Sequence, residues 1–199
     1  GISTLDGIIL DNANLSGTEL SGISMKNASM KNANLTGANL KNLDMTTIDI
    51  TGANMTDAIV DGVNISGHDL TNTILTGDLK GLKSGNNSGT PILSSKHALI
   101  DGYIVGENVD LAGANLKTAD LTDISLKGAI LANVDMSEAT LTNLKSGLTL
   151  VGNTLLPSGY ISFPMWTESG TVKGGNIIGP GVDLTDTYFE KYPSSANFG

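Results

Sequence analysis

Apolar residues recur at every fifth position over the first 75 residues of the chain. Positions 5, 10, 15 and so on to 75 are all Leu, Met, Ile or Val. An amphipathic helix repeats its apolar face about every 3.6 residues and a strand about every 2 residues, so neither explains a period of five. The pattern predicts a chain that turns a corner once in every five residues.

The position two residues after each apolar centre supplies the corner. Thirteen of these fifteen positions hold Gly or Asn, which adopt positive φ at low cost. The full series is Gly7, Asn12, Gly17, Gly22, Asn27, Asn32, Gly37, Asn42, Thr47, Gly52, Asp57, Gly62, Gly67, Asn72 and Gly77. Each pentad is therefore predicted to be a short extended segment followed by a corner.

The pentads at 33–37 (ANLTG), 38–42 (ANLKN) and 114–118 (ANLKT) resemble the A-[DN]-L-x-x motif of the pentapeptide-repeat family. The resemblance implies an all-β fold, a right-handed four-sided parallel β-helix with four pentads in each coil. It also implies that the centre residue and the residue two before it point inward. Residues 20 apart would then stack, and the inward column at 13, 33 and 53 is Ala throughout.

The pentads fall into arrays that are separated by hairpin-like interruptions. We expect a first array at 1–78, of about four coils, and an interruption with a hairpin at 79–108. A second array of about two coils would follow at 109–145, then a longer aromatic-containing interruption at 146–181. Residues 182–199 would begin a third array or form a C-terminal cap.

The two interruptions resemble each other. LKSG at 82–85 recurs at 144–147, and IVGENVDL at 104–111 matches IIGPGVDL at 177–184. In the first, HALI-DG-YIV at 97–105 predicts a β-hairpin with an Asp-Gly turn. In the second, strands are expected at 160–163 and 171–173. Spacers of this kind resemble those of long pentapeptide-repeat proteins of marine microbes and their viruses.

Composition argues against several classes of function. The formal net charge is −9, and all 11 basic residues are Lys, so nucleic-acid binding is not expected. Cysteine is absent, which removes disulfides and thiolate chemistry. No apolar run approaches the roughly 20 residues of a membrane span. Because residue 1 is Gly and not Met, we expect a processed chain or a segment of a longer one.

The acidity raises an alternative, because some members of the family mimic DNA and bind type II topoisomerases. The outward lysines argue against it. In the stacked frame Asp6 lies beside Lys26, Asp11 beside Lys31, and Lys41 beside Asp61, so each such lysine would cancel part of a negative stripe. The topoisomerase-binding DNA mimic, a cytoplasmic protein, is kept as the alternative function.

No catalytic, cofactor-binding or metal-binding motif is present, and we expect no cofactor. His68 falls on an inward position and is expected to be a packed histidine, and His97 lies in a different segment. Seven of the eight aromatic residues lie at or after residue 160. Tyr160, Phe163 and Trp166 could form an interaction patch or a small satellite core under the longer interruption.

These features together predict a non-enzymatic structural or interaction scaffold, a rigid acidic β-solenoid. Its partners would be proteins or further copies of the chain, through coil stacking. The family resemblance, the absence of cysteine and the Ser/Thr/Asn-rich exterior favour an extracellular, cell-surface or virion fibre assembly.

Overall fold

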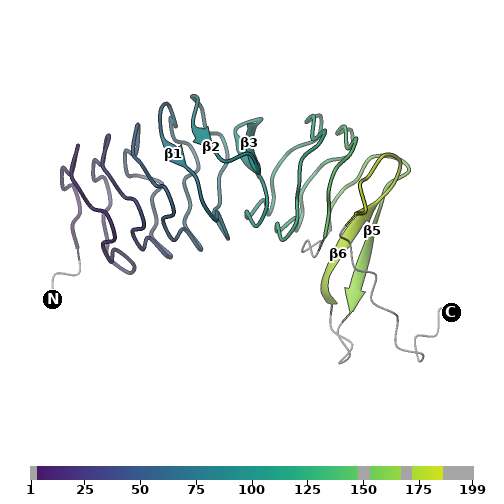
Figure 1. The fold of residues 1–199 in the computed structure, drawn as a ribbon, viewed down its shortest axis with the longest axis horizontal. Coiled ribbons are helices and arrows are strands. Elements are labelled where there is room, and N and C mark those ends of the chain that lie inside the picture. The colour runs from purple at the N-terminus through teal and green to yellow at the C-terminus, as the bar shows by residue number, and fades with distance from the viewer. Residues whose placement is uncertain (1–3, 148–152, 167–171, 186–199) are drawn as a thin grey trace. The chain divides into compact units, whose positions relative to one another are not determined.

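The computed structural model describes residues 4–147, 153–166 and 172–185. The chain divides into two compact units, Gly1–Leu111 and Ala112–Gly199 (Figure 1). The described residues form strands, single-residue bridges and turns, and contain no helix. None of them therefore forms a helix of the length and apolarity that crossing a bilayer demands.

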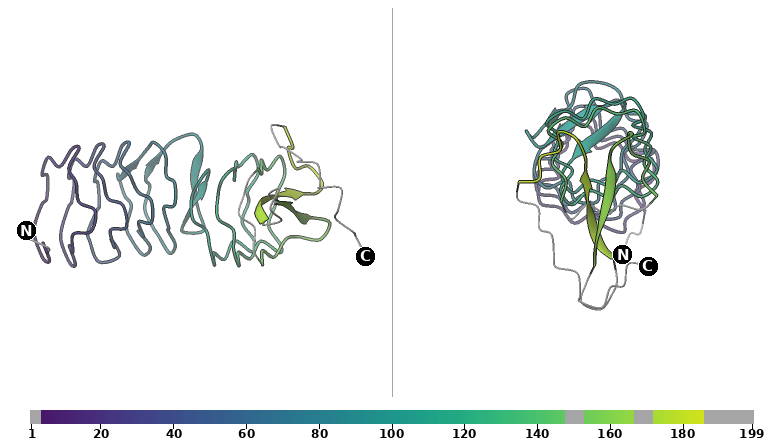
Figure 2. Two further views of the ribbon diagram at one scale, coloured as in Figure 1. Left: turned by 90° about the horizontal axis from the view of Figure 1, so that it is seen from below. Right: turned by 90° about the vertical axis from the view of Figure 1, so that its right-hand side faces the viewer.

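The coils of the first unit stack through parallel bridges between residues 20 apart, such as Thr4 with Ser24, and Asn34 with both Asn14 and Asn54. Each bridge is one rung of a ladder of backbone hydrogen bonds; the Leu35 amide, for example, donates to the Asn54 carbonyl at 2.7 Å. Figure 2 shows these coils as a row of parallel loops. The 20-residue spacing confirms four pentads in each coil.

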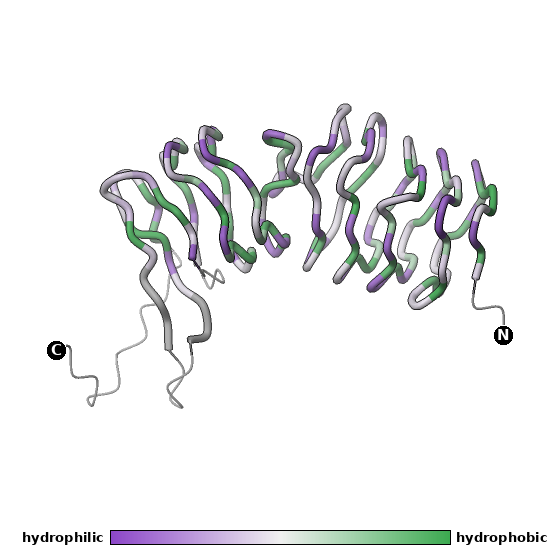
Figure 3. The backbone as a smooth tube through the Cα atoms, turned by 180° about the vertical axis from the view of Figure 1, so that it is seen from behind, coloured by the Kyte–Doolittle hydropathy of each residue, from purple (hydrophilic) through white to green (hydrophobic). Residues whose placement is uncertain are grey.

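The pentad centres and the residues two before them fill the interior of each coil. Met30, Leu35, Leu40, Ala33 and Ala38 are fully buried. Hydrophobic and hydrophilic positions alternate along every coil in Figure 3, as expected for one inward and one outward face. The inward assignment drawn from the pentad pattern is confirmed.

The corners have the backbone geometry that their residues predict. Every corner from Gly7 to Gly77 has positive φ except Thr47. A β-branched residue pays heavily for positive φ, so the chain turns differently at Thr47. The Thr47 hydroxyl there accepts a hydrogen bond from the Asn27 amide, at 3.1 Å.

Coiling continues beyond residue 78 with a shorter repeat. Asn64 bridges Lys83 and Asp69 bridges Ser88, each pair 19 residues apart. Strand β1 (Ile74–Leu75) pairs in parallel with β2 (Ile92–Leu93). One residue has been dropped from the coil, and Leu79 and Leu82 take its buried positions.

The predicted hairpin of the first interruption is confirmed. Strand β3 (His97–Ile100) pairs antiparallel with β4 (Tyr103–Gly106), and Ile100 lies opposite Tyr103. Asp101 and Gly102 both have positive φ, which defines the two-residue turn whose twist matches the strands.

The second unit repeats this plan. Its coils are bridged 20 residues apart, as between Asn115 and Asp135. Strands β5 (Ile161–Trp166) and β6 (Val172–Ile178) form an antiparallel pair with an irregularity between Met165 and Trp166. Both strands are longer than the 160–163 and 171–173 that the sequence predicts.

The two hairpins are tied to their coils by the same device. The buried Ser84 hydroxyl accepts a hydrogen bond from the Ile104 amide at 2.8 Å, and Ser146 accepts one from Ile177 at 2.9 Å. Lys83 then bridges Asp110, and Lys145 bridges Asp183, where each new coil begins. The sequence match between the interruptions is therefore a structural match.

Candidate functional site

Outward polar side chains of the coils are mostly engaged in local locks. An Asp or Asn one residue before a pentad centre accepts a hydrogen bond from the amide two residues on, and commonly from that residue's hydroxyl. Asn34 Oδ1 takes the Thr36 amide at 3.1 Å and the Thr36 hydroxyl at 2.7 Å. The same lock holds at Asn14, Asp44, Asp49, Asn54, Asn64, Asp69, Asp120, Asp135 and Asp183. These groups stabilise corners and are not directed at a substrate.

Ion pairs join successive coils, as the stacked frame predicts. Lys41 Nζ lies 3.2 Å from Asp61 Oδ2, a predicted pair that is confirmed. Lys31 differs, because its ammonium pairs with Asp49 on the following coil at 3.1 Å. The Asp11 carboxylate instead accepts the Lys31 backbone amide, at 3.1 Å. Both ion pairs are about half exposed, so their main effect is on register and local charge.

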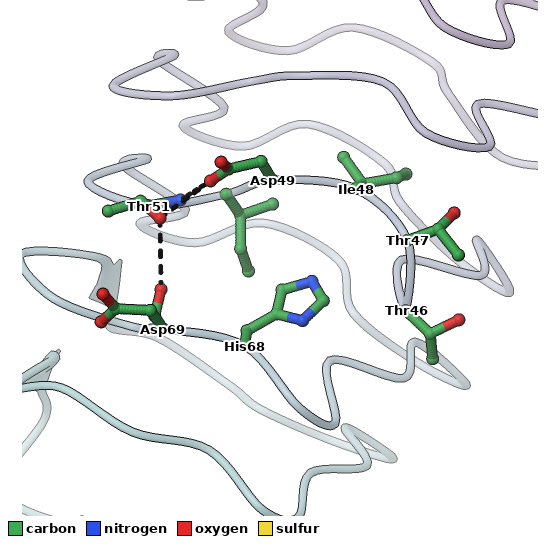
Figure 4. A pocket seen from close by; sticks show the side chains of 8 residues that line it. Thr46, Thr47, Ile48, Asp49, Thr51, His68 and Asp69 are labelled. Carbon is green, nitrogen blue, oxygen red and sulfur yellow. Dashed lines mark hydrogen bonds between the residues drawn. The ribbon is translucent and has the colours of Figure 1, made fainter.

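The deepest polar opening in the first unit lies between two successive coils. It has a volume of about 300 Å³ and is lined by Thr46, Thr47, Ile48, Asp49, Ile50, Thr51, His68 and Asp69. We call it the Asp49–Asp69 slot. Figure 4 shows the His68 ring projecting into the opening beneath the Thr46–Thr51 segment, with both aspartates on the opposite side.

The rung that should close this slot is missing. Ser29 bridges both Ile9 and Asp49, and Asp69 bridges Ser88, but no described bridge joins Asp49 to Asp69. The Asp69 carbonyl is instead contacted by the Thr51 hydroxyl, at 3.4 Å. The coils are therefore held apart where two carboxylates stack.

His68 is the most unusual inward residue of the slot. It follows Ile8, Ala28 and Ile48 in one inward column and is only 9% exposed. Its buried Nε2 atom has no hydrogen-bond partner. The expectation of a packed histidine is confirmed for burial, but a packed histidine normally has a partner for a buried nitrogen.

A second opening of about 370 Å³ lies where the coil loses a residue, between Asp57–Asp61 and Asp78–Lys80. Its polar groups are already engaged. Asp61 pairs with Lys41. Asp78 Oδ1 accepts the Lys80 amide at 3.1 Å and the Asn108 side-chain amide at 3.2 Å.

His97 serves the first hairpin and does not approach His68. Its Nδ1 atom lies 2.8 Å from the Ser94 hydroxyl, and its Nε2 atom lies 3.0 Å from the Glu107 carbonyl. Lys96 pairs with the Glu107 carboxylate at 2.8 Å. These contacts fix the start of β3.

The predicted aromatic patch is described only in part. The Tyr160 hydroxyl donates to the Pro180 carbonyl at 2.7 Å, which ties the start of the second hairpin to its end. Phe163 and Trp166 lie on β5, but their side chains fall outside the described residues. The patch stays a prediction.

Metal ligands do not converge in the part of the chain that the structure describes. No group of three or more His, Asp or Glu side chains there is placed to hold a metal ion. The Asp49–Asp69 slot thus offers a histidine and two carboxylates without a metal-binding geometry. Sequence reasoning missed this slot, although Asp49, Asp69 and His68 could be placed on adjacent coils from the 20-residue period.

The family is decided by sequence comparison. The model of pentapeptide repeats matches residues 8–46, 48–77 and 107–143, in eight copies. The chain belongs to the pentapeptide repeat family. Its fold is accordingly the right-handed four-sided β-helix of that family, and the matched segments coincide with the coils described above.

Solved pentapeptide repeat proteins resemble the chain at low identity. HetL, involved in heterocyst differentiation regulation in the cyanobacterium Nostoc, is 21% identical over 72% of this chain, with a TM-score of 0.28; the chain spans 60% of HetL. A protein of the Arabidopsis thaliana thylakoid lumen is 20% identical over 61% of this chain and 68% of its own, with a TM-score of 0.21. QnrB1, a plasmid-mediated fluoroquinolone resistance protein, is 15% identical over 78% of this chain and 84% of its own, with a TM-score of 0.32. None of these similarities bears on function. A search of curated protein sequences finds no match.

Proposed function

We propose that the chain is a non-enzymatic scaffold, a pentapeptide-repeat β-helix that holds protein partners or further copies of itself. The supporting observation is how its polar exterior is used. The repeated Asp and Asn locks and the ion pairs between coils commit most outward groups to the coil itself. A surface of this kind favours a fixed geometry over chemistry on a substrate.

We extend this proposal to an extracellular, cell-surface or virion fibre assembly. Its support is compositional, because the chain lacks cysteine and the sequence repeats an array followed by a braced hairpin. A unit that repeats along one axis can be extended without a new design of the core.

The alternative is a DNA mimic that binds a type II topoisomerase, and the net charge of −9 favours it. The distribution of charge opposes it. Lys31 and Lys41 lie within reach of carboxylates on neighbouring coils, so the negative potential is interrupted along the stack.

Inhibition of DNA supercoiling by purified gyrase separates the two functions. The scaffold proposal predicts unchanged supercoiling with the chain in large molar excess over gyrase. The double variant Lys31→Gln, Lys41→Gln, which removes two interrupting positive charges, is the matched control for a latent DNA-like surface. Inhibition by the wild-type chain, and stronger inhibition by the variant, would overturn the scaffold proposal.

A further inference from the structure

Two like charges stack at the Asp49–Asp69 slot. The pKa of Asp69 is lowered overall, chiefly by the Thr71 hydroxyl and amide, while the charge of Asp49 acts in the opposite direction. Like charges placed directly opposite each other across a ladder are destabilising. The missing rung between these two residues is the structural counterpart of that repulsion.

Several polar groups around the slot have no partner among the described residues. In a regular rung the Ile50 amide would donate to the Asp69 carbonyl, and the Asp69 amide would donate to the Ile48 carbonyl; neither bond forms. The buried His68 Nε2 atom has no partner either. Asp69 uses Oδ1 for its lock with Thr71, which leaves Oδ2 to face outward. The slot therefore combines unmet hydrogen-bonding groups with excess negative charge.

We propose that the Asp49–Asp69 slot binds a primary alkylammonium group. The ammonium would lie between the stacked carboxylates of Asp49 and Asp69 and donate toward the imidazole of His68. An ammonium carries three donors in a tetrahedral arrangement, which suits acceptors that come from two separate coils. Its charge offsets the repulsion between the two aspartates, and its methylenes contact the threonines and Ile48 at the slot's wall.

Other ligand classes fit the slot less well. An anion would face two carboxylates. A metal ion would need converging ligands, which the described side chains do not supply. A guanidinium group needs a planar, paired set of acceptors, whereas these acceptors lie on different coils. The alkylammonium could belong to a free amine or to a lysine side chain of a protein partner.

The test is a titration of the full chain with butylammonium chloride, followed by NMR. The proposal predicts saturable shifts of the Ile50 and Asp69 amides and of the His68 ring, with the His97 ring as an internal reference. Butanol, which has the same shape without the charge, and sodium chloride at equal ionic strength should not reproduce them. Shifts that are absent, or that either control reproduces, would overturn the proposal.

Two variants make the test specific. Asp69→Asn keeps the oxygen that locks Thr71 but removes the charge, and it should weaken binding by at least about tenfold. Asp120→Asn alters a carboxylate with the same threonine lock that stacks on Thr140 and not on an acid, so binding should be unchanged. Equal binding by the wild type and Asp69→Asn would contradict the assignment.

A lysine-containing peptide, acetyl-Gly-Lys-Gly-amide, distinguishes the source of the ammonium. Tighter binding than butylammonium identifies a partner's lysine as the ligand, and weaker binding identifies a small free amine. The site is overturned if neither compound binds. This outcome is independent of the gyrase assay, so the site and the scaffold proposal can fail separately.

Discussion

At the scale of single residues, the corners decide where side chains are tolerated. Gly67 and Gly89 have nearly the same backbone, with φ of +83° and +86°. A Cβ atom at Gly67 would meet open space. A Cβ atom at Gly89 would lie 2.5 Å from the Thr71 amide nitrogen and 2.5 Å from Asp69 Oδ1. Contact with the neighbouring coil, and not φ alone, therefore makes glycine obligatory at position 89.

The first prediction compares alanine at these two glycines. Gly67→Ala should cost about 1–2 kcal/mol, from the strain of positive φ alone. Gly89→Ala should cost a further 1–3 kcal/mol or so, because the backbone of Thr71 must shift. Urea unfolding of both variants measures the difference. Equal losses would show that the close approach at Gly89 has no energetic weight.

The second prediction concerns the threonine locks and pH. The Thr122 hydroxyl, followed by the Thr122 amide, lowers the pKa of Asp120. Because the folded pKa lies below the unfolded one, the lock contributes stability above about pH 4 and loses it as pH falls through the lowered pKa. Thr122→Val should raise the Asp120 pKa toward its ordinary value and reduce the loss of stability on acidification.

Carbonyl NMR titration of Asp120 checks this expectation. Thr118→Val is the matched control, since Thr118 is exposed and makes no side-chain hydrogen bond to Asp120. An unchanged Asp120 titration in Thr122→Val would show that the amide alone sets its pKa.

At the scale of elements, each hairpin depends on one buried serine. The Ile104 amide, which accepts no water because Ile104 is fully buried, donates to Ser84. Ser84→Ala should cost about 1–3 kcal/mol, because it leaves that amide without an acceptor. The Ile104 amide should also exchange with solvent faster. Ser88→Ala, at an exposed serine four residues on, is the control and should change neither quantity.

The same substitution in the second unit tests whether the two braces are equivalent. Ser146→Ala removes the acceptor of the Ile177 amide. A loss similar to that of Ser84→Ala is expected. If only one of the two serines matters, the structural match between the interruptions carries no common energetic role.

The elements show what a sequence pattern can and cannot foretell. The Asp101-Gly102 turn was predictable because it imposes positive φ on both residues. The full length of β5 and β6 was not, because Pro164 and Gly175 face each other in the middle of the pair. Proline and glycine disfavour strands by themselves, and only the partner strand makes them acceptable here.

At the scale of the whole chain, the period of five fixes the coils but not their exceptions. Centres, inward residues and corners follow from the spacing, since each depends on its own pentad. The Asp49–Asp69 slot depends on contacts between residues 20 apart and on the loss of one rung. A pattern places the two aspartates in one column, but the opening of the ladder and the unpartnered His68 nitrogen require the structure.

Native-state hydrogen exchange of single amides tests the central claim most directly, namely a stack of 20-residue coils joined rung by rung and open at Asp49 and Asp69. The Leu35 and Asn54 amides, which donate to neighbouring coils at 2.7 and 2.9 Å, should exchange slowly. The Ile50 and Asp69 amides should exchange faster by about two orders of magnitude or more. Uniform protection of all four amides would contradict the open rung, and rapid exchange at Leu35 and Asn54 would contradict the coil stack itself.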